Sequence, residues 1–310
     1  MRNNFVKQIM KEMEKNQNIF FLTGDLGFNA LEPVAKKFPE RFLNVGAAEG
    51  SMMGIAAGLA LEGRKVIAYS IASFSSMRPY EQIRTDICYH NLDVKIIGTG
   101  GGFNYPTHGV THHTVEDLAI MSVLPNMKVF NPGYSWEADE STHAMILDKG
   151  PAYIRLGKKP DQNYNKDNWR FEIGKGYEIK EGKDLVIFVT GNIIDYAVEA
   201  ALIVEKLSGI KVGIVSMPTI KPIDKKTIIK KSVNAKHIFS IEEHSIIGGL
   251  GAQIGSILSE NNIDVKFKMF GIEDKFIKSV GDRSFLCEEA GLSPKIISKK
   301  ILNIIKQKSA

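Results

Sequence analysis

The first half of the chain alternates short apolar runs with stretches of helical periodicity. Helical patterns cover residues 1–16, follow Glu49, and recur near 80–90. Apolar runs of strand length lie at 19–22, 65–69, 94–98, 126–130 and 152–156. Strands that alternate with helices in this way form mostly parallel sheets covered by helices. The pattern therefore predicts an α/β domain.

The same alternation starts again after a polar interruption. Residues 158–168 read KKPDQNYNKDN, which lacks apolar periodicity and is the best linker candidate in the chain. Strand patterns then follow at 184–190, 211–216 and 236–241, with a helical pattern at 193–207. We therefore predict two α/β domains, residues 1–160 and 183–310, joined by a linker at 161–182.

The composition argues against several classes of function. The net charge of +5 is spread over many lysines with no dense basic run among aromatic residues, so nucleic-acid binding has little support. Cys88 and Cys287 are too few for a disulfide framework or a cysteine-rich metal site, which favours a reducing cytoplasm. No segment has the length of a membrane span, and residues 1–16 lack the apolar core of a signal peptide. We expect a cytoplasmic protein without a membrane or nucleic-acid partner.

One carboxylate, Glu49, lies in an unusually apolar segment. Residues 44–61 read NVGAAEGSMMGIAAGLAL. Because burying an unpaired ionised carboxylate is costly, such a group either holds a proton or is paired, and both states suit proton chemistry. The alternative is an exposed Glu in the first turn of a buried helix, favourable to the helix dipole and without a chemical role. Gly50, Gly54 and Gly58 follow at four-residue spacing, and this stripe predicts a close helix–helix seam.

Two glycine-rich runs look like nucleotide-binding turns but lack the required spacing. VKIIGTGGGF, at 94–103, has Phe103 where a third glycine or alanine belongs, and a proline follows where a helix should begin. IIGGLGAQIG, at 246–255, precedes a predicted helix and is better explained by a tight turn and close helix packing. No GxxxxGK[ST] loop occurs, which excludes a P-loop nucleotidase.

Three histidines gather in the segment PTHGVTHHTVED, at 106–117. Zinc binding is not favoured, because the adjacent His112 and His113 point in different directions and no fourth ligand is spaced nearby. Imidazoles that line a polar pocket fit better, since histidine both donates to and accepts from substrate oxygens near neutral pH. The alternative is that one or two of these histidines cap the helix and pack.

Together these segments resemble the transketolase superfamily of thiamine diphosphate enzymes through nearly the whole chain. FPERFLNVGAAEGSMMGIAAGLAL resembles the signature of the pyrimidine-binding domain, whose Glu contacts the cofactor and falls on Glu49. THHTVEDLAIMSVLPNMKVFNP resembles the loop and helix whose first His reaches the substrate, here His112. EEHSIIGGLGAQI resembles the C-terminal domain of the same family. The resemblance implies that Glu49 and His112 are catalytic, and that Glu49 binds N1′ of the aminopyrimidine so that the 4′-nitrogen can deprotonate thiazolium C2.

The cofactor pocket departs from the common sugar-transferring members. Their TFxxF sequence reads SIASF here, so Phe74 remains as a ring partner and Ile71 replaces the other aromatic residue. Arg78 and Arg84 flank a helix near this pocket, as anion contacts or as surface charges.

The substrate end departs as well. The family's GxDGxTHQ reads PTHGVTHH, which puts His108 where an acid meets a substrate hydroxyl and His113 where Gln follows. The phosphate-binding Arg of sugar-phosphate members aligns with Lys158, which attracts phosphate as a point charge or is a solvated charge at the linker. The resemblance thus implies His108, His113 and Lys158 as substrate-binding residues.

The superfamily's other module has no match in this chain. That module binds the diphosphate through Mg²⁺ with a GDG sequence and a downstream Asn, whereas GDLG at 24–27 comes too early and lacks a suitable Asn. The resemblance implies that a separate N-terminal subunit supplies the metal and diphosphate ligands, with α2β2 as the simplest closed assembly. No metal ligand is assigned to this chain.

These features imply one subunit of a transketolase-like enzyme that transfers a two-carbon ketol unit from a ketose to an aldehyde. Two alternatives stay open. A β-type subunit of a 2-oxo acid dehydrogenase or decarboxylase shares the same domain order. A non-catalytic assembly subunit would keep the fold without the chemistry.

Overall fold

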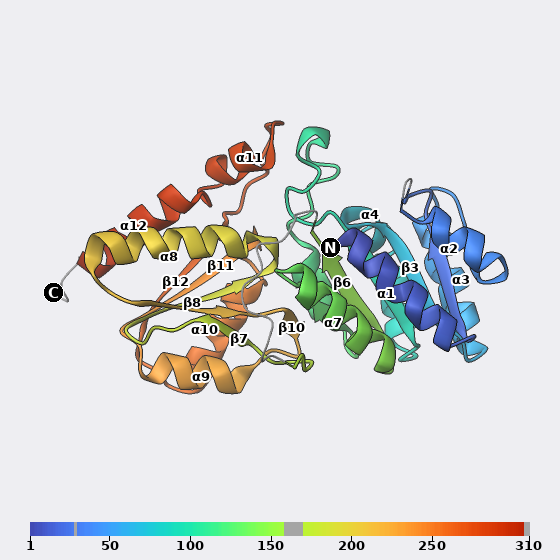
Figure 1. The fold of residues 1–310 in the computed structure, drawn as a ribbon, viewed down its shortest axis with the longest axis horizontal. Coiled ribbons are helices and arrows are strands. Elements are labelled where there is room, and N and C mark those ends of the chain that lie inside the picture. The colour runs from blue at the N-terminus through green and yellow to red at the C-terminus, as the bar shows by residue number, and fades with distance from the viewer. Residues whose placement is uncertain (28–29, 158–169, 307–310) are drawn as a thin grey trace.

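Two layered α/β domains lie side by side along the long axis of the molecule (Figure 1). The computed structural model describes residues 1–27, 30–157 and 170–306. Each domain has a mostly parallel sheet with helices on both faces, which confirms the predicted fold class. None of the helices in these ranges combines the length and apolar character that a membrane crossing requires.

The sheet of the first domain has seven strands in the order β10-β5-β6-β4-β3-β1-β2. Every pairing is parallel except that of β10 with β5. The strands are β1 (Ile19–Thr23), β2 (Phe42–Asn44), β3 (Lys65–Ile71), β4 (Val94–Thr99), β5 (Lys128–Phe130), β6 (Ala152–Leu156) and β10 (Thr219–Lys221). The central strands are buried along almost their whole length, as continuous apolar runs in a parallel sheet require.

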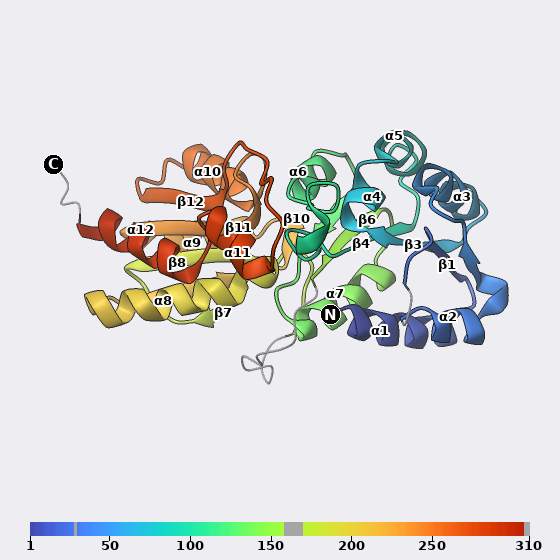
Figure 2. The ribbon, with the colours of Figure 1, turned by 90° about the horizontal axis from the view of Figure 1, so that it is seen from above.

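Helices cover both faces of this first sheet (Figure 2). One layer contains α1 (Arg2–Lys15), α2 (Glu32–Lys37) and α7 (Ser135–Leu147). The other contains α3 (Glu49–Leu61), α4 (Ala72–Ser76), α5 (Tyr80–Gln82), the π-helix η2 (Ile83–Cys88) and α6 (Asp117–Ser122). Glu49 is the first residue of α3, so this second layer contributes to the candidate site.

The second domain has a five-stranded sheet in the order β12-β11-β8-β9-β7. Its strands are β7 (Tyr177–Lys180), β8 (Leu185–Thr190), β9 (Val212–Ser216), β11 (His237–Ser245) and β12 (Lys266–Ile272). The helices α8 (Ile194–Ser208) and α12 (Pro294–Lys306) pack on one face, and α9 (Lys225–Val233) and α10 (Leu250–Glu260) on the other (Figure 1). The short α11 (Arg283–Glu289) lies on the side of the first domain (Figure 2).

The structure differs from the predicted domain boundaries at two places. The expected linker, 161–182, contains β7, which pairs antiparallel with β9 and so belongs to the second sheet. The strand β10 comes from the second half of the chain but completes the first sheet, with Thr219 opposite Phe130. The polar segment 158–168, the best linker candidate, lies outside the described residues. The second half of the chain therefore contributes one strand, β10, to the sheet of the first domain.

Candidate active site

Glu49 is the first residue of α3, and its carboxylate lies at the carboxyl ends of the parallel strands. Only 3% of the residue is exposed. Ser70, at the end of β3, donates its hydroxyl to Oε1 at 3.0 Å, and Arg78 donates Nη1 to Oε2 at 3.1 Å. Gly24, which follows β1, lies against the carboxylate, where a Cβ would make an ordinary van der Waals contact of 3.5 Å with Oε1. Glu49 is thus a buried and paired acid, and not an exposed residue of the first turn.

Arg78 connects this acid to an aromatic ring. Its guanidinium carbon lies 3.8 Å from the centroid of Phe74, which α4 carries. The side chain of Arg78 is 52% exposed, so the cation closes the carboxylate off from solvent while remaining at the surface itself. The planar guanidinium of Arg78 therefore contacts both the face of Phe74 and the carboxylate of Glu49.

The loop between β4 and α6, residues 100–116, carries the three clustered histidines and is called the histidine loop. The rings of His112 and Phe74 are 5.0 Å apart and meet edge to face. His108 lies 4.7 Å from His112 between ring centroids. Ser73, beside Phe74, donates its hydroxyl to the carbonyl of Thr111 at 3.1 Å. A continuous line of contacts thus runs from Glu49 through Arg78 and Phe74 to His112 and His108.

His113 faces away from this line. Its ring packs on Phe103 at 5.2 Å and its Nε2 lies 3.5 Å from the carbonyl oxygen of Pro106. Burial lowers the pKa of His113, which favours the neutral ring. The structure therefore brings His112 and His108 to Phe74 but not His113, as expected for adjacent residues that point in different directions.

The remaining residues that the sequence suggested for the site lie in different places. Ile71 is buried at the end of β3 and directly precedes α4, three positions before Phe74. Lys158 lies outside the described residues. Arg84 lies on η2, where it lines a different cavity.

The comparisons with known proteins cover both domains. Residues 1–163 match the model for the pyrimidine binding domain of transketolase, and residues 174–297 match the model for the transketolase C-terminal domain. The chain belongs to the transketolase family. It is 37% identical over 310 residues to a putative transketolase C-terminal section of Methanocaldococcus jannaschii, covering 99% of this chain and 96% of that one.

Two further relatives match this transketolase-family chain over nearly its full length. A 6-deoxy-6-sulfo-D-fructose transketolase subunit of a Clostridium species is 30% identical, with 100% of this chain and 95% of that one covered. A solved structure described as a split gene transketolase, inactive beta4 tetramer, superposes with a TM-score of 0.88 at 35% identity, with 99% of both chains covered.

Transketolase-family enzymes depend on thiamine diphosphate, and the residues present fit its aminopyrimidine end. A buried acceptor, Glu49, and an aromatic face, Phe74, already contact a planar group with N–H donors, the guanidinium of Arg78. An aminopyrimidine is also planar and presents nitrogen donors, so the same two groups would suit it. In the ranges 1–27, 30–157 and 170–306, no group of three or more His, Cys, Asp or Glu residues is placed to hold a metal ion.

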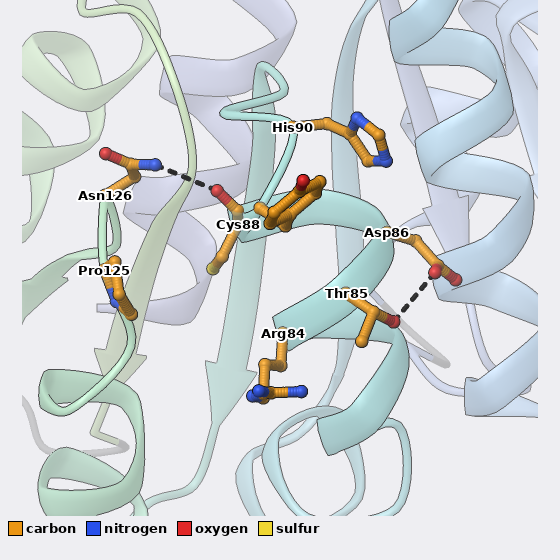
Figure 3. Close-up of a pocket in the computed structure, with 8 residues that line it drawn as sticks. Arg84, Thr85, Asp86, Cys88, His90, Pro125 and Asn126 are labelled. Atoms are coloured by element: carbon orange, nitrogen blue, oxygen red, sulfur yellow. Dashed lines mark hydrogen bonds between the residues drawn. The ribbon is translucent and has the colours of Figure 1, made fainter.

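A separate cavity of about 620 Å³ lies against η2 (Figure 3). It is lined by Arg84, Thr85, Asp86, Cys88, Tyr89, His90, Pro125 and Asn126. Burial raises the pKa of Cys88 to about 11, so the thiol stays protonated and is a poor nucleophile. Because neither Glu49 nor Phe74 nor the histidine loop lines this cavity, it is not the site described above.

Two residues that shape the site were not predicted from the sequence. Ser70 stands in the SIASF segment, and its hydroxyl bond to Glu49 depends on the end of β3 meeting the start of α3. Arg155 is 4% exposed within the apolar strand β6 and donates to the carbonyl of Thr114 in the histidine loop at 2.8 Å. A charged residue inside an apolar run was the signal available for Arg155.

Proposed function

We propose that this chain is the pyrimidine-binding and C-terminal subunit of a split, thiamine diphosphate-dependent transketolase-like enzyme. The reaction is the transfer of a two-carbon ketol unit from a ketose to an aldehyde. The observation that carries the proposal is the buried carboxylate of Glu49 at the carboxyl edge of the sheet, which Arg78 connects to the partly buried ring of Phe74. Sites in open α/β sheets form at this edge.

Glu49 has the chemistry that the first step needs. Thiamine diphosphate, when bound, supplies a thiazolium carbon that adds to a substrate carbonyl. Glu49 would hold and share a proton at N1′ of the aminopyrimidine, with Ser70 orienting its other oxygen. Phe74 would stack against the pyrimidine ring, and Ile71 would supply apolar contact without a second aromatic face.

The histidine loop supplies the substrate end of the proposed site. His112 touches the edge of Phe74 and would donate to or accept from a substrate oxygen. His108, which is exposed and lies beside His112, would meet the next oxygen along the substrate. The ring of His113 packs on Phe103, so the main substrate contacts that we propose are those of His112 and His108. Lys158 remains the candidate for binding a substrate phosphate.

The proposed partner is an N-terminal subunit that holds the diphosphate and Mg²⁺, in an α2β2 assembly. The relatives described as a C-terminal section, a subunit and an inactive tetramer of β chains support a division of one enzyme between two chains. The exposed side of α3 is the surface that we propose for contact with this partner. Gly54 and Gly58 are exposed, a Cβ at either would meet nothing within 4 Å, and Ile55 and Leu61 lie exposed on the same helix.

The decisive experiment is reconstitution with a subunit that carries the GDG and Asn module. The complex, supplied with thiamine diphosphate and Mg²⁺, should transfer the ketol unit from a ketose to an aldehyde. Glu49→Gln should lower kcat at least about 100-fold, the usual range for removing a proton-transfer group, while the complex still assembles. The matched control is Glu62→Gln, which changes an exposed acid at the other end of α3.

Three results would contradict the proposal. Turnover retained by Glu49→Gln would remove its central residue. Tight cofactor binding by this chain alone would contradict the divided site. Release of CO2 from a 2-oxo acid, without ketol transfer, would assign the pair to the oxo acid dehydrogenases or decarboxylases.

A further inference from the structure

The second domain holds the base of the histidine loop, although it contributes none of the residues around Glu49. The loop closes on itself through Gly102 and Thr114, which exchange two backbone hydrogen bonds of 2.7 and 3.0 Å. Beyond this base the loop is open to solvent, since Val110 is 50% exposed and Thr111 and His108 are also exposed. The position of the loop tip therefore depends on how the base is held, together with the hydrogen bond from Ser73 to Thr111.

Glu243, in β11, makes the central contact with the base. Its Oε1 accepts the backbone N–H of Phe103 at 2.6 Å, a bond between residues 140 positions apart. Its Oε2 accepts Nε of Arg283 at 3.0 Å, and Arg283 lies over the ring of Tyr196 at 5.2 Å. Since Glu243 is 3% exposed, this is a buried and charge-assisted hydrogen-bond network. The carboxylate is thus fixed within its own domain and holds the loop backbone from there.

Arg155 holds the other strand of the base. Its Nη2 donates to the carbonyl oxygens of both Thr114 and Glu243, each at 2.8 Å. Its Nη1 lies 3.6 Å from Asp117 at the start of α6. One guanidinium therefore connects the second strand of the loop base to the same residue of β11 that holds the first.

The three-glycine run before the loop is explained by this close approach. A Cβ at Gly101 would lie 2.0 Å from Nε of Arg155, and a Cβ at Gly102 would lie 2.4 Å from Oε1 of Glu243. Gly102 also has a φ of +66°, which favours glycine. The run that resembles a nucleotide-binding turn instead lets the backbone lie against two buried charged side chains.

We propose that Glu243 is a positioning residue for His112. It acts from the C-terminal domain through the backbone of Phe103 and sets where the loop presents its histidines beside Phe74. The inference rests on the proposed function for the substrate role of His112, but the contact that positions the loop belongs to this chain alone.

The neighbouring residue Glu242 offers a matched control. Both acids lie in β11, both are buried, and both accept backbone N–H groups. Glu242 accepts those of Leu250 at 2.7 Å and Gly251 at 2.8 Å, at the start of α10 in its own domain. Glu242→Ala therefore destabilises the second domain without releasing the loop, whereas Glu243→Ala releases it.

The first readout needs neither cofactor nor substrate. Hydrogen–deuterium exchange of the full chain, followed by mass spectrometry, should show amides of residues 103–113 exchanging about tenfold faster in Glu243→Ala, and within about twofold of wild type in Glu242→Ala. Equal acceleration in both variants, or none in Glu243→Ala, overturns the proposal. If Glu243→Ala does not fold, Gly102→Ala takes its place, because the added methyl group would collide with Oε1 of Glu243.

The second readout uses the reconstituted complex and separates positioning from general damage. Glu243→Ala should raise KM for the ketose about tenfold while the Kd for thiamine diphosphate stays within about twofold. Glu243→Gln, whose amide oxygen can still accept the Phe103 N–H although its NH2 group then faces Arg283, should recover part of that loss, and Glu242→Ala should leave KM unchanged. A faster-exchanging loop with an unchanged KM overturns the positioning role. If wild-type complex shows no ketol transfer, the proposed function fails, and the exchange experiment still decides whether Glu243 holds the loop.

Discussion

Arg78 makes the two contacts that the proposed cofactor ring requires. It donates to Oε2 of Glu49 at 3.1 Å, and its guanidinium lies 3.8 Å from the centroid of Phe74. An aminopyrimidine that binds the same carboxylate and the same ring face must displace this cation. On the proposed function, Arg78 would therefore compete with the cofactor, and it gives the buried Glu49 a counter-charge.

Arg78→Met tests this competition. The variant should bind thiamine diphosphate about tenfold more tightly in the reconstituted complex, because an exposed cation–π contact and a surface ion pair together amount to about 1–2 kcal/mol. The free chain should unfold at a lower temperature, since Glu49 is left buried without its ion partner. Calorimetric titration and thermal unfolding measure the two effects. Arg84→Met, which changes an arginine that lines the cavity at η2, is the control; equal or weaker cofactor binding by Arg78→Met would refute the competition.

Lys95 gives the chain a pH-dependent stability at a site remote from Glu49. Its side chain is fully buried and its ammonium lies 2.8 Å from a carboxylate oxygen of Asp93. Burial lowers the pKa of Lys95 to about 8, from an ordinary value of 10.5, and Asp93 only partly opposes this shift. The unfolded chain therefore binds more protons than the folded chain between these two pH values, and the contribution of Lys95 to stability rises with pH across that window.

The comparison of wild type with Lys95→Met measures this effect. The free energy of unfolding of wild type should rise by about 3 kcal/mol relative to the variant between pH 8 and pH 10.5, since each pKa unit corresponds to about 1.4 kcal/mol. Urea unfolding at a series of pH values supplies the numbers. The control is Lys226→Met, which changes an exposed lysine of α9. Its free energy of unfolding should change with pH as that of wild type does. A difference between wild type and Lys95→Met that does not change with pH would show that the ammonium keeps an ordinary pKa.

At the scale of elements, one side of α3 is buried against the sheet and the other is exposed. Met52, Met53 and Ala56 are buried against the sheet. Gly54 and Gly58 lie on the exposed side, where a Cβ would meet nothing within 4 Å. Glycine in a helix interior destabilises by about 0.5–1 kcal/mol relative to alanine, so these positions weaken the isolated chain. A partner backbone that packs closely here is the proposed reason for them.

Gly54→Ala should therefore act in opposite directions on the free chain and on the complex. The free chain should gain about 0.5–1 kcal/mol of stability from the better helix former. Association with the N-terminal subunit should weaken, because the added methyl group separates the two backbones. Gly255→Ala in α10, where a Cβ would only touch Phe267 at 3.5 Å, should stabilise the chain without affecting assembly. Unchanged affinity of the Gly54→Ala chain for its partner would place the seam elsewhere.

The elements differ in how far sequence could predict them, and their environment explains why. The long buried runs of β1, β3, β4, β6 and β8 have continuous apolar residues, which the pattern identifies directly. The strands β2, β7 and β10 are short and lie at sheet edges, and no apolar run marks them. Edge strands bury less surface, so their sequences carry a weaker signal.

The candidate site shows the same division. The burial and pairing of Glu49 could be predicted, because an ionised carboxylate in an apolar helix is unfavourable unless it is paired. The family resemblance pointed to Phe74 and His112. The contact of Glu243 with Phe103 was not predictable from spacing, since it joins two domains across 140 positions and depends on the glycines between them. Long-range hydrogen bonds of this kind follow from the packing of whole elements and leave no local pattern.

At the scale of the whole molecule, buried polar contacts join the two domains. Glu137, in α7, is completely buried and accepts the hydroxyl of Ser216, in β9, at 2.6 Å. The same carboxylate accepts the backbone N–H of Gly133 at 2.6 Å, and burial raises its pKa. The strand β10 follows β9 directly and pairs with β5 of the first sheet. Neither domain can unfold without exposing an edge or a buried acid of the other.

We therefore expect the full chain to unfold in a single transition despite its two domains. Differential scanning calorimetry should give one peak with equal calorimetric and van't Hoff enthalpies, the mark of two-state unfolding. Ser216→Ala leaves the Glu137 carboxylate short of a buried donor, which costs about 1–3 kcal/mol, so that the peak should move down by a few degrees without splitting. Ser208→Ala, which removes bonds to Val204 and Ile210 at the C-terminal end of α8, within the second domain, should move it less. Two separate peaks in wild type would mean that the domains unfold independently, and a peak that splits in Ser216→Ala alone would mean that this one bond provides the coupling.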